Sequence, residues 1–213
     1  MNNTTNQTRT IVEVRMPYKT RTLVEIGMLG AIATVLMLFE FPLPFIAPPF
    51  YELDLSEVPV LVGAFALGPA AGAMIELIKV LLNLLINGTA TACVGEIANY
   101  IIGCSFIIPA ALIYKKRKSK KNALLGMVIG TATMAALGCF INAYVLLPTY
   151  AAAFGMPIDA IVGIGSSINA NINDILSFVV LAVAPFNIIK GIVVSMITLL
   201  IYKHISPLLK GNR

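Results

Sequence analysis

Long apolar stretches, separated by polar or proline-rich segments, dominate the sequence. Six stretches are candidate membrane helices, and they cover residues 22–41, 58–68, 70–87, 97–114, 122–147 and 175–202. A helix needs roughly 20 apolar residues to cross the hydrocarbon core of a bilayer, and continuous rather than alternating apolar residues favour helices over a barrel. The pattern predicts an all-α integral membrane protein in which six transmembrane helices form a single domain, residues 21–205.

Composition agrees with a membrane protein, and the positions of the charges predict its orientation. Hydrophobic residues make up 58% of the 213 residues and charged residues only 12%, whereas charge in soluble domains is near a quarter. Apart from Lys79 and Lys190, all basic residues lie before Thr22, in the cluster KKRKSKK at 115–121, or after Tyr202. Such clusters mark cytoplasmic flanks. We therefore expect a cytoplasmic arm (1–20), a cytoplasmic tail (206–213) and no nucleic-acid partner.

The segment from Pro42 to Pro59 is too rich in proline to be a helix and is predicted to be a long external loop. A loop of this length in a small bundle is usually a lid or a binding loop, although a structured connector is the alternative. The alternation from Tyr51 to Leu55 favours a short extended piece whose backbone could face a ligand. A second long external segment, 148–174, is predicted as either a surface helix or an extended lid.

Residues 58–87 must return to the outside if both basic flanks are cytoplasmic. Gly68 and Pro69 supply a break, so we expect two legs rather than one crossing. The first leg, 58–67, is too short to span a bilayer upright, and a re-entrant hairpin or a local thinning of the membrane would accommodate it.

Four polar residues are predicted to lie at a similar depth in the outer half of the membrane. Counting about 1.5 Å of rise per residue from the basic flanks places Asn99, Asn142, Asn187 and Lys190 about 20–32 Å above them. A charge at this depth costs about 3 kcal/mol or more, which marks Lys190 as a functional-site candidate. We expect a polar cavity open to the outside. The alternative is that these residues only tie helices together through hydrogen bonds.

Further residues are assigned by position. Glu96 is added because it lies at the mouth of the fourth span, and Phe186 is one of several aromatic residues that could stack on a flat ring. Asparagine amides complement an imide or amide edge of such a ring. Pro185 is expected to kink the last span.

Two features are predicted to serve packing or partner contact. Lys79 follows Glu76 by three residues, at a spacing suited to an ion pair in a scaffold or a partner contact. A stripe of small residues on the first span permits close helix contact, either within the bundle or with another protein. The stripe comprises Gly27, Gly30, Ala31 and Thr34.

The sequence lacks the common signatures of an enzyme. It has no GxxxxGK[ST] motif, no HExxH motif and no His, Cys and carboxylate spacing typical of a metal site. We therefore expect a solute-binding protein without a cofactor that depends on partners for energy. An intramembrane enzyme is the alternative from another functional class.

Five segments resemble the riboflavin-specific S components of energy-coupling-factor (ECF) transporters. They are PLPFIAPPFYELDLSEVP (42–59), GAFALGPAAGAMIELIKVLLN (63–83), GEIANY (95–100), INAYVLLPTY (141–150) and PFNIIKGIVVS (185–195). The resemblance covers nearly the whole membrane region, from Leu23 to the last helix. An S component for another vitamin or heterocycle is the alternative within transport.

The resemblance implies a six-helix S-component fold in the plasma membrane, which captures riboflavin from outside. It also implies that the chain catalyses nothing and works with a transmembrane coupling subunit and two cytoplasmic ATPases. Matching motif positions assign flavin hydrogen bonds to Asn142, Asn187 and Lys190. The resemblance further implies that the Tyr51–Leu55 part of the first loop, including Tyr51, Glu52 and Leu53, covers the ligand and lends backbone contacts.

Overall fold

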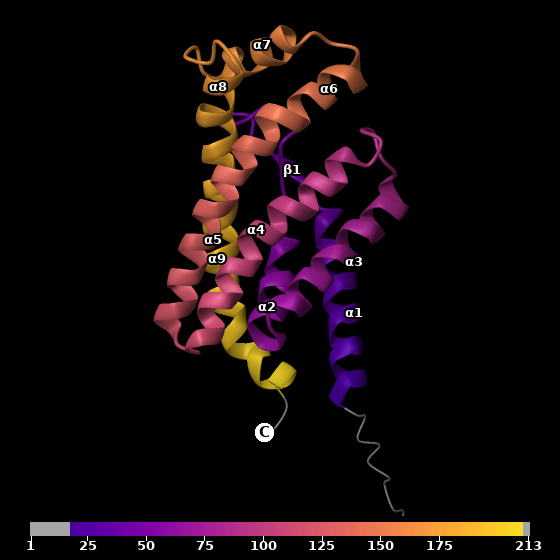
Figure 1. Cartoon of the computed structure of the whole chain (residues 1–213), viewed down its shortest axis with the longest axis vertical. Helices are drawn as coiled ribbons and strands as arrows, with labels where there is room; N and C mark the ends of the chain where they lie inside the picture. The colour runs from indigo at the N-terminus through magenta and orange to yellow at the C-terminus, as the bar shows by residue number, and fades with distance from the viewer. Residues whose placement is uncertain (1–17, 211–213) are drawn as a thin grey trace, which may run out of the picture.

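The structure is a computed structural model that describes the backbone of residues 18–210 and the side chains of residues 20–202. Most of the predicted arm (1–17) and the end of the predicted tail (211–213) lie outside the described residues. Nearly all of the described chain is helical (Figure 1). Its elements are α1 Tyr18–Met37, β1 Phe41–Pro42, β2 Glu52–Leu53, α2 Glu57–Leu67, α3 Pro69–Asn87, α4 Val94–Lys116, α5 Lys120–Ile141, η1 Asn142–Leu146, α6 Leu147–Phe154, α7 Ile158–Ile168, α8 Ile175–Phe178, η2 Val179–Val183 and α9 Ala184–Lys210.

Five helices of the described chain are long and apolar enough to cross a membrane. They are α1, α3, α4, the continuous α5–η1–α6 and the continuous α8–η2–α9. The remaining predicted span, 58–68, corresponds to α2, which has 11 residues and a length of only about 16 Å. Every residue of α2 from Glu57 to Phe65 is buried, and α2 contacts α1, α3, α4 and α9. Protein rather than lipid therefore surrounds this short leg.

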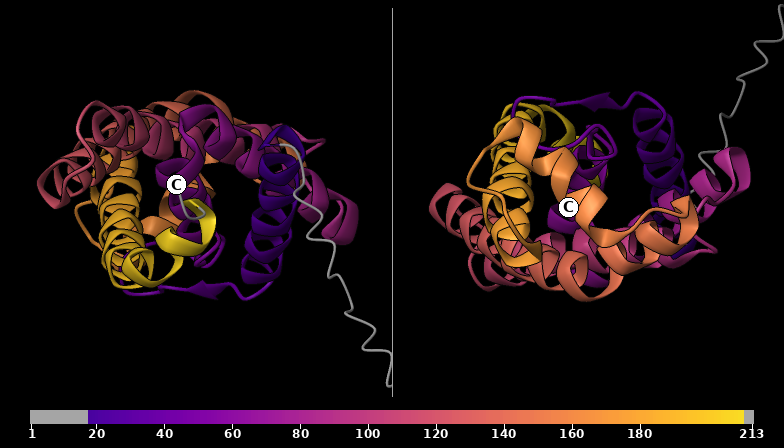
Figure 2. Two further views of the ribbon diagram at one scale, coloured as in Figure 1. Left: turned by 90° about the horizontal axis from the view of Figure 1, so that it is seen from below. Right: turned by 90° about the horizontal axis from the view of Figure 1, so that it is seen from above.

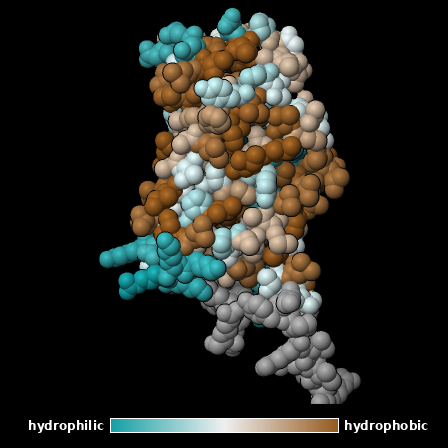
Figure 3. Space-filling model, in the orientation of Figure 1, coloured by the Kyte–Doolittle hydropathy of each residue, from teal (hydrophilic) through white to brown (hydrophobic). Residues whose placement is uncertain are grey.

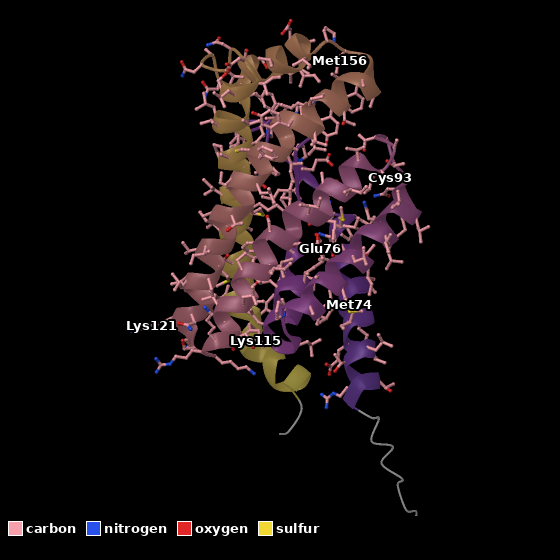
Figure 4. The ribbon with its side chains drawn as sticks, in the orientation of Figure 1. Met74, Glu76, Cys93, Lys115, Lys121 and Met156 are labelled. Atoms are coloured by element: carbon pink, nitrogen blue, oxygen red, sulfur yellow. The ribbon has the colours of Figure 1, made fainter. Side chains whose placement is uncertain are left out.

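The ends of the bundle differ in character. The start of α1, the turn between α4 and α5 and the end of α9 lie at one end, whereas α6, α7 and α8 lie at the other (Figure 1). Viewed from either end, the long helices form a ring-like outline (Figure 2). Lys115 and Lys121 mark the first end (Figure 4), where a hydrophilic patch borders a mostly hydrophobic surface (Figure 3). The basic segments thus gather at one end, as their assignment to one side of the membrane requires.

Two predicted helix boundaries were wrong. The first helix ends at Met37 rather than residue 41, because Phe41–Pro42 is extended and proline disfavours a helical residue before it. The fifth span continues past residue 147 to Phe154 through the π-helical segment η1. Both η1 and η2 end two residues before a proline, Pro148 and Pro185 respectively. The deformation expected at Pro185 therefore takes the form of a π-helical turn.

The two predicted loops contain regular structure, and the extended piece predicted within 51–55 is confirmed by β2. In the first, Phe41 pairs with Leu53 and Pro42 with Glu52 in a short antiparallel ladder, the only strand pairing among residues 18–210. The prediction that this loop is external was wrong in part, because Asp54 and Ser56 are buried within the bundle. In the second, residues 158–168 form α7, which selects a helix over an extended lid for this part.

Candidate functional site

A cavity of about 440 Å³ lies between the first loop and helices α3, α4, α5 and α9. Its wall combines apolar side chains, among them Met37, Ile102, Met134 and Phe186, with an unusual number of polar groups for a membrane bundle. The polar residues that line it are Glu40, Tyr51, Glu52, Asp54, Glu57, Asn83, Thr91, Glu96, Asn99, Asn142, Tyr150, Asn187 and Lys190. A mostly formed cavity with a few convergent polar groups is typical of a small-molecule site.

Eight of the nine predicted binding residues line this single cavity, namely Tyr51, Glu52, Glu96, Asn99, Asn142, Phe186, Asn187 and Lys190. Leu53 is the exception. Its side chain is buried in the apolar cluster that includes Phe178 and Val183. Successive residues of a strand point to opposite sides, so Leu53 could offer a ligand only its backbone.

The two asparagines each use one amide hydrogen within their own helix. Asn142 Nδ2 donates to the carbonyl oxygen of Gly138 at 2.8 Å, and Asn187 Nδ2 donates to that of Val183 at 2.9 Å. A carboxamide nitrogen carries two hydrogens, so each side chain retains one donor for a ligand. Gly138 is important here, since an added Cβ would lie only 3.0 Å from Asn187 Nδ2. The glycine thus lets α5 and α9 bring both amides to the cavity.

Tyr51 attaches the first loop to α5–η1. Its hydroxyl donates a 2.5 Å hydrogen bond to Asn142 Oδ1, and its ring lies 5.7 Å from that of Phe186 and 4.9 Å from that of Phe50, centroid to centroid. Burial raises the pKa of the Tyr51 hydroxyl well above its usual value. The hydroxyl therefore stays protonated and acts as a hydrogen-bond donor over the physiological pH range.

Lys190 is paired with Asp54 of the first loop. Its ammonium lies 2.8 Å from Asp54 Oδ2, and the two side chains are 13% and 6% exposed. Asp54 Oδ1 accepts a hydrogen bond from the Ser56 backbone N–H at 2.7 Å. Burial alone would raise the pKa of Asp54, but Lys190, then Lys79 and the Ser56 hydrogen bond, hold it well below its usual range. Sequence reasoning missed this pair, although a buried lysine in a membrane span calls for a nearby carboxylate.

A second charged cluster lies beside the cavity. The Lys79 ammonium lies 2.8 Å from Glu57 Oε1 and 2.7 Å from Glu76 Oε1. The predicted Glu76–Lys79 ion pair is confirmed, whereas the contribution of Glu57 was not foreseen. Lys79 is 1% exposed, so of the two predicted roles the structure supports the scaffold and not a partner contact. Glu76 lies within the bundle, between its two ends (Figure 4). The described residues contain no group of three or more His, Cys, Asp or Glu able to hold a metal.

The small-residue stripe on α1 does not form one surface. Gly30 is buried, and a Cβ there would lie 2.6 Å from Ile78 of α3; Thr34 is 3% exposed and bonds the Gly30 carbonyl oxygen. Gly27 and Ala31 are exposed instead. The stripe is thus divided between packing, for Gly30 and Thr34, and an outer face, for Gly27 and Ala31.

Comparison with known proteins decides the family. Residues 21–202 match the family described as the substrate-specific component of ECF transporters. The chain is an ECF transporter S component. Relatives include the riboflavin transporter RibU of Staphylococcus aureus, 38% identical over 88% of this chain and 92% of the relative, and the riboflavin transporter FmnP of Bacillus subtilis, 35% identical over 92% and 97%. A solved S component of a bacterial ECF transporter is 36% identical, with a TM-score of 0.71 over 91% of this chain and 99% of that one.

Membership of this family establishes the general role of the molecule. S components are multi-pass plasma-membrane subunits that bind a transported substrate and work with an ECF module, and they are not enzymes. The solved structure establishes the S-component fold for this chain. The intramembrane enzyme considered above is thereby set aside.

Proposed function

We propose that this S component captures riboflavin in the cavity bounded by Asn142, Asn187 and Lys190. The observation that carries the proposal is the arrangement of these groups around one cavity, combined with the riboflavin transporters among the relatives of the chain. The two amides and the ammonium present hydrogen-bond donors to the same space, which suits the carbonyl-rich edge of an isoalloxazine ring. The Tyr51 and Phe186 rings supply flat apolar surface for the remainder of the ring.

The first loop covers the cavity in this proposal. Tyr51 and Asp54 connect it to the α5–η1 helix and to α9 through the same two side chains, Asn142 and Lys190, that face the ligand. Glu52 lines the cavity from this loop, and Glu96 and Asn99 line it from α4. A bound flavin would share or replace these loop contacts, so occupancy of the cavity and position of the loop are linked.

The orientation follows from charge. Basic flanks favour the cytoplasmic side, which directs the start of α1, the α4–α5 turn and the end of α9 inward. The α6–α8 end then faces outward and admits the substrate. Transport would require a transmembrane coupling subunit and two cytoplasmic ATPases. The exposed Gly27 and Ala31 of α1 are the residues proposed to contact the coupling subunit, since Gly30 packs on α3 and Thr34 is buried.

The experiment uses the full-length protein, purified in detergent without added ligand. Its visible absorption spectrum is recorded, and the ligand-free form is titrated with riboflavin while flavin fluorescence is followed. We expect saturable quenching with one flavin per chain. Lys190→Ala and Asn187→Ala should each weaken binding by roughly 10- to 100-fold, since a hydrogen bond to a buried polar group is worth about 1–3 kcal/mol.

The control is Asn83→Ala, which alters a cavity-lining amide outside the proposed flavin set. It should leave the affinity within about threefold of the wild type. A protein that ignores riboflavin would refute the flavin assignment and leave the S-component fold intact, and other vitamins and heterocycles would then be titrated in the same way. Binding that survives in both Lys190→Ala and Asn187→Ala would place the flavin elsewhere.

A further inference from the structure

The cluster of Glu57, Lys79 and Glu76 combines two carboxyl groups with one ammonium inside the bundle. The three side chains are 2%, 1% and 0% exposed. They come from α2 and α3, and α4 closes the cluster at Gly103, where an added Cβ would overlap Glu76 Oε1 and lie 3.1 Å from Glu57 Oε1. Glu57 lines the cavity described above but Lys79 and Glu76 do not, so contact with the cavity does not explain why two acids converge on one base here.

The charges of the cluster do not balance if all three groups are ionised. One ammonium neutralises one carboxylate, and an uncompensated charge buried in a membrane bundle is strongly unfavourable. The ionisable groups that interact with Glu76 are Glu57, Lys79 and Lys190, with Tyr100 and Cys104 facing it from α4. Lys190 is already paired with Asp54 at 2.8 Å. The second carboxyl therefore has no cation of its own among the described side chains.

The geometry distinguishes the two acids. The Lys79 ammonium donates a hydrogen bond to Glu57 Oε1 at 2.8 Å. Its 2.7 Å contact with Glu76 Oε1 lies outside hydrogen-bond geometry, so neither oxygen of Glu76 receives a hydrogen bond from the described protein groups, whereas Glu57 lacks one only at Oε2. A carboxylate at zero exposure normally accepts several hydrogen bonds, whereas a protonated carboxyl carries no charge to stabilise.

We propose that the Glu57–Lys79–Glu76 cluster is a proton-binding site, in which one proton resides on Glu76 and Lys79 pairs with ionised Glu57. The site is then electrically neutral. Glu57 and Gly103 also line the substrate cavity, so the proton sets the charge of the cavity floor. A neutral floor suits an uncharged solute, while a deprotonated one would add a buried negative charge directly beneath it.

Infrared spectroscopy tests this site in the full-length protein, purified in an ester-free detergent such as a maltoside. A protonated carboxyl group has a carbonyl band that carboxylates lack. The measurement is made in Glu40→Gln protein, because the pKa of the Glu40 carboxyl, raised to about 8, would add a second such band. We expect a band that exchanges slowly in D2O, and we expect Glu76→Gln to abolish it. The absence of the band, or its survival in Glu76→Gln, would overturn the proposal.

Thermal unfolding of the same proteins shows which of the two glutamates holds the proton. Glu76→Gln exchanges one neutral group for another and should keep the melting temperature within about 2 °C, whereas Glu57→Gln removes the hydrogen-bonded anion and should lower it by about 4 °C or more. Glu57→Gln should also abolish the band, since Glu76 must then ionise to pair with Lys79. The reverse order of the two melting temperatures would overturn the assignment to Glu76. So would stabilisation by Na⁺ relative to choline at equal ionic strength that Glu76→Gln removes, because a metal cation would then replace the proton.

Discussion

Lys190 of α9 and Asp54 of the first loop, 136 residues apart in the chain, form an ion pair of 2.8 Å at the wall of the cavity proposed to bind the substrate. The contact satisfies the one ammonium in this part of the last helix and also fixes the buried end of the loop. Since both residues line the cavity, the pair connects the stability of the ligand-free protein with the groups available to a substrate.

Removing the Asp54 carboxylate should show how strongly the stability of the ligand-free protein depends on this ion pair. Asp54→Asn leaves the Lys190 ammonium without a counter-charge, and loss of one partner from a buried pair costs about 3 kcal/mol or more. We expect the melting temperature of the ligand-free S component to fall by about 6–12 °C, measured by thermal unfolding in detergent.

The double variant Asp54→Asn/Lys190→Met is the control for this prediction. It removes the stranded charge and should recover much of the lost stability, so the effects of the two substitutions should be far from additive. The depressed pKa of Asp54 means that its contribution is fully present above its unfolded pKa of about 3.9 and is lost only as the pH falls further. Asp54 also helps to raise the pKa of Glu40, which titrates in this range, so the cost of Asp54→Asn is measured in Glu40→Gln protein, where it should be constant from about pH 5 to 8. Additive single effects would contradict the pairing.

Tyr51→Phe tests the other attachment of the loop. The change leaves Asn142 Oδ1 without the Tyr51 donor in a site where Asn142 is 2% exposed. Such an unsatisfied acceptor costs about 1–3 kcal/mol, which should appear as a lower melting temperature. Tyr144→Phe is the matched control, because the Tyr144 side chain is 71% exposed on the same π-helical segment. Equal effects of the two variants would argue against the Tyr51–Asn142 bond.

Much of the cavity could be predicted because polar residues are costly in a membrane. Counting helical rise was enough to place Asn99, Asn142, Asn187 and Lys190 at similar depths, and all four line one cavity. Their contacts with a ligand remain predictions. The helices themselves followed from apolar length, including the short α2, whose end is defined by Gly68 with a φ of 109°.

The remainder depended on contacts between distant segments. Nothing in the local pattern of the first loop indicated that Asp54 enters the bundle while Glu52 stays exposed. Nor could spacing on α1 show that Gly30 and Thr34 are buried while Gly27 and Ala31 are exposed, since all four small residues fit one broad stripe. The π-helical turns also lay beyond sequence reasoning, because an inserted residue alters which side chains face the cavity without altering composition.

The carboxyl of Glu40 predicts a pH effect. Burial, followed by the neighbouring Glu52 and Asp54 carboxylates, raises the pKa of Glu40 to about 8, compared with about 4.3 in an unfolded chain. The folded state thus binds the Glu40 proton more tightly, and the contribution of Glu40 to stability decreases as the pH rises from about 4.3 to 8. Glu40→Gln removes this loss. In thermal unfolding, the advantage of the variant over the wild type should grow up to about pH 8 and then stay constant. A difference that does not change with pH would contradict the raised pKa.

Gly103 should tolerate no side chain. Gly103→Ala would place a Cβ against both carboxyl groups of the buried cluster, and overpacking of this kind typically costs about 1–3 kcal/mol. Gly163→Ala in α7 is the matched control, since a Cβ there meets nothing within 4 Å and alanine favours a helix. The melting temperature should fall for the first variant and stay equal or rise for the second. Similar values would mean that the cluster can move away from α4.

The exposed face of α1 provides the last prediction, which separates substrate capture from transport. Gly27→Leu and Ala31→Leu enlarge side chains that point away from the bundle, where a Cβ at Gly27 meets nothing within 4 Å. Riboflavin affinity in detergent should therefore be unchanged. Close approach of another membrane helix requires small residues, so uptake into cells that express the full transporter should fall at least several-fold. Ala132→Leu, at an exposed position of α5, controls for added bulk. If it impairs uptake as strongly, or if the α1 variants transport normally, the contact with the coupling subunit lies on another face.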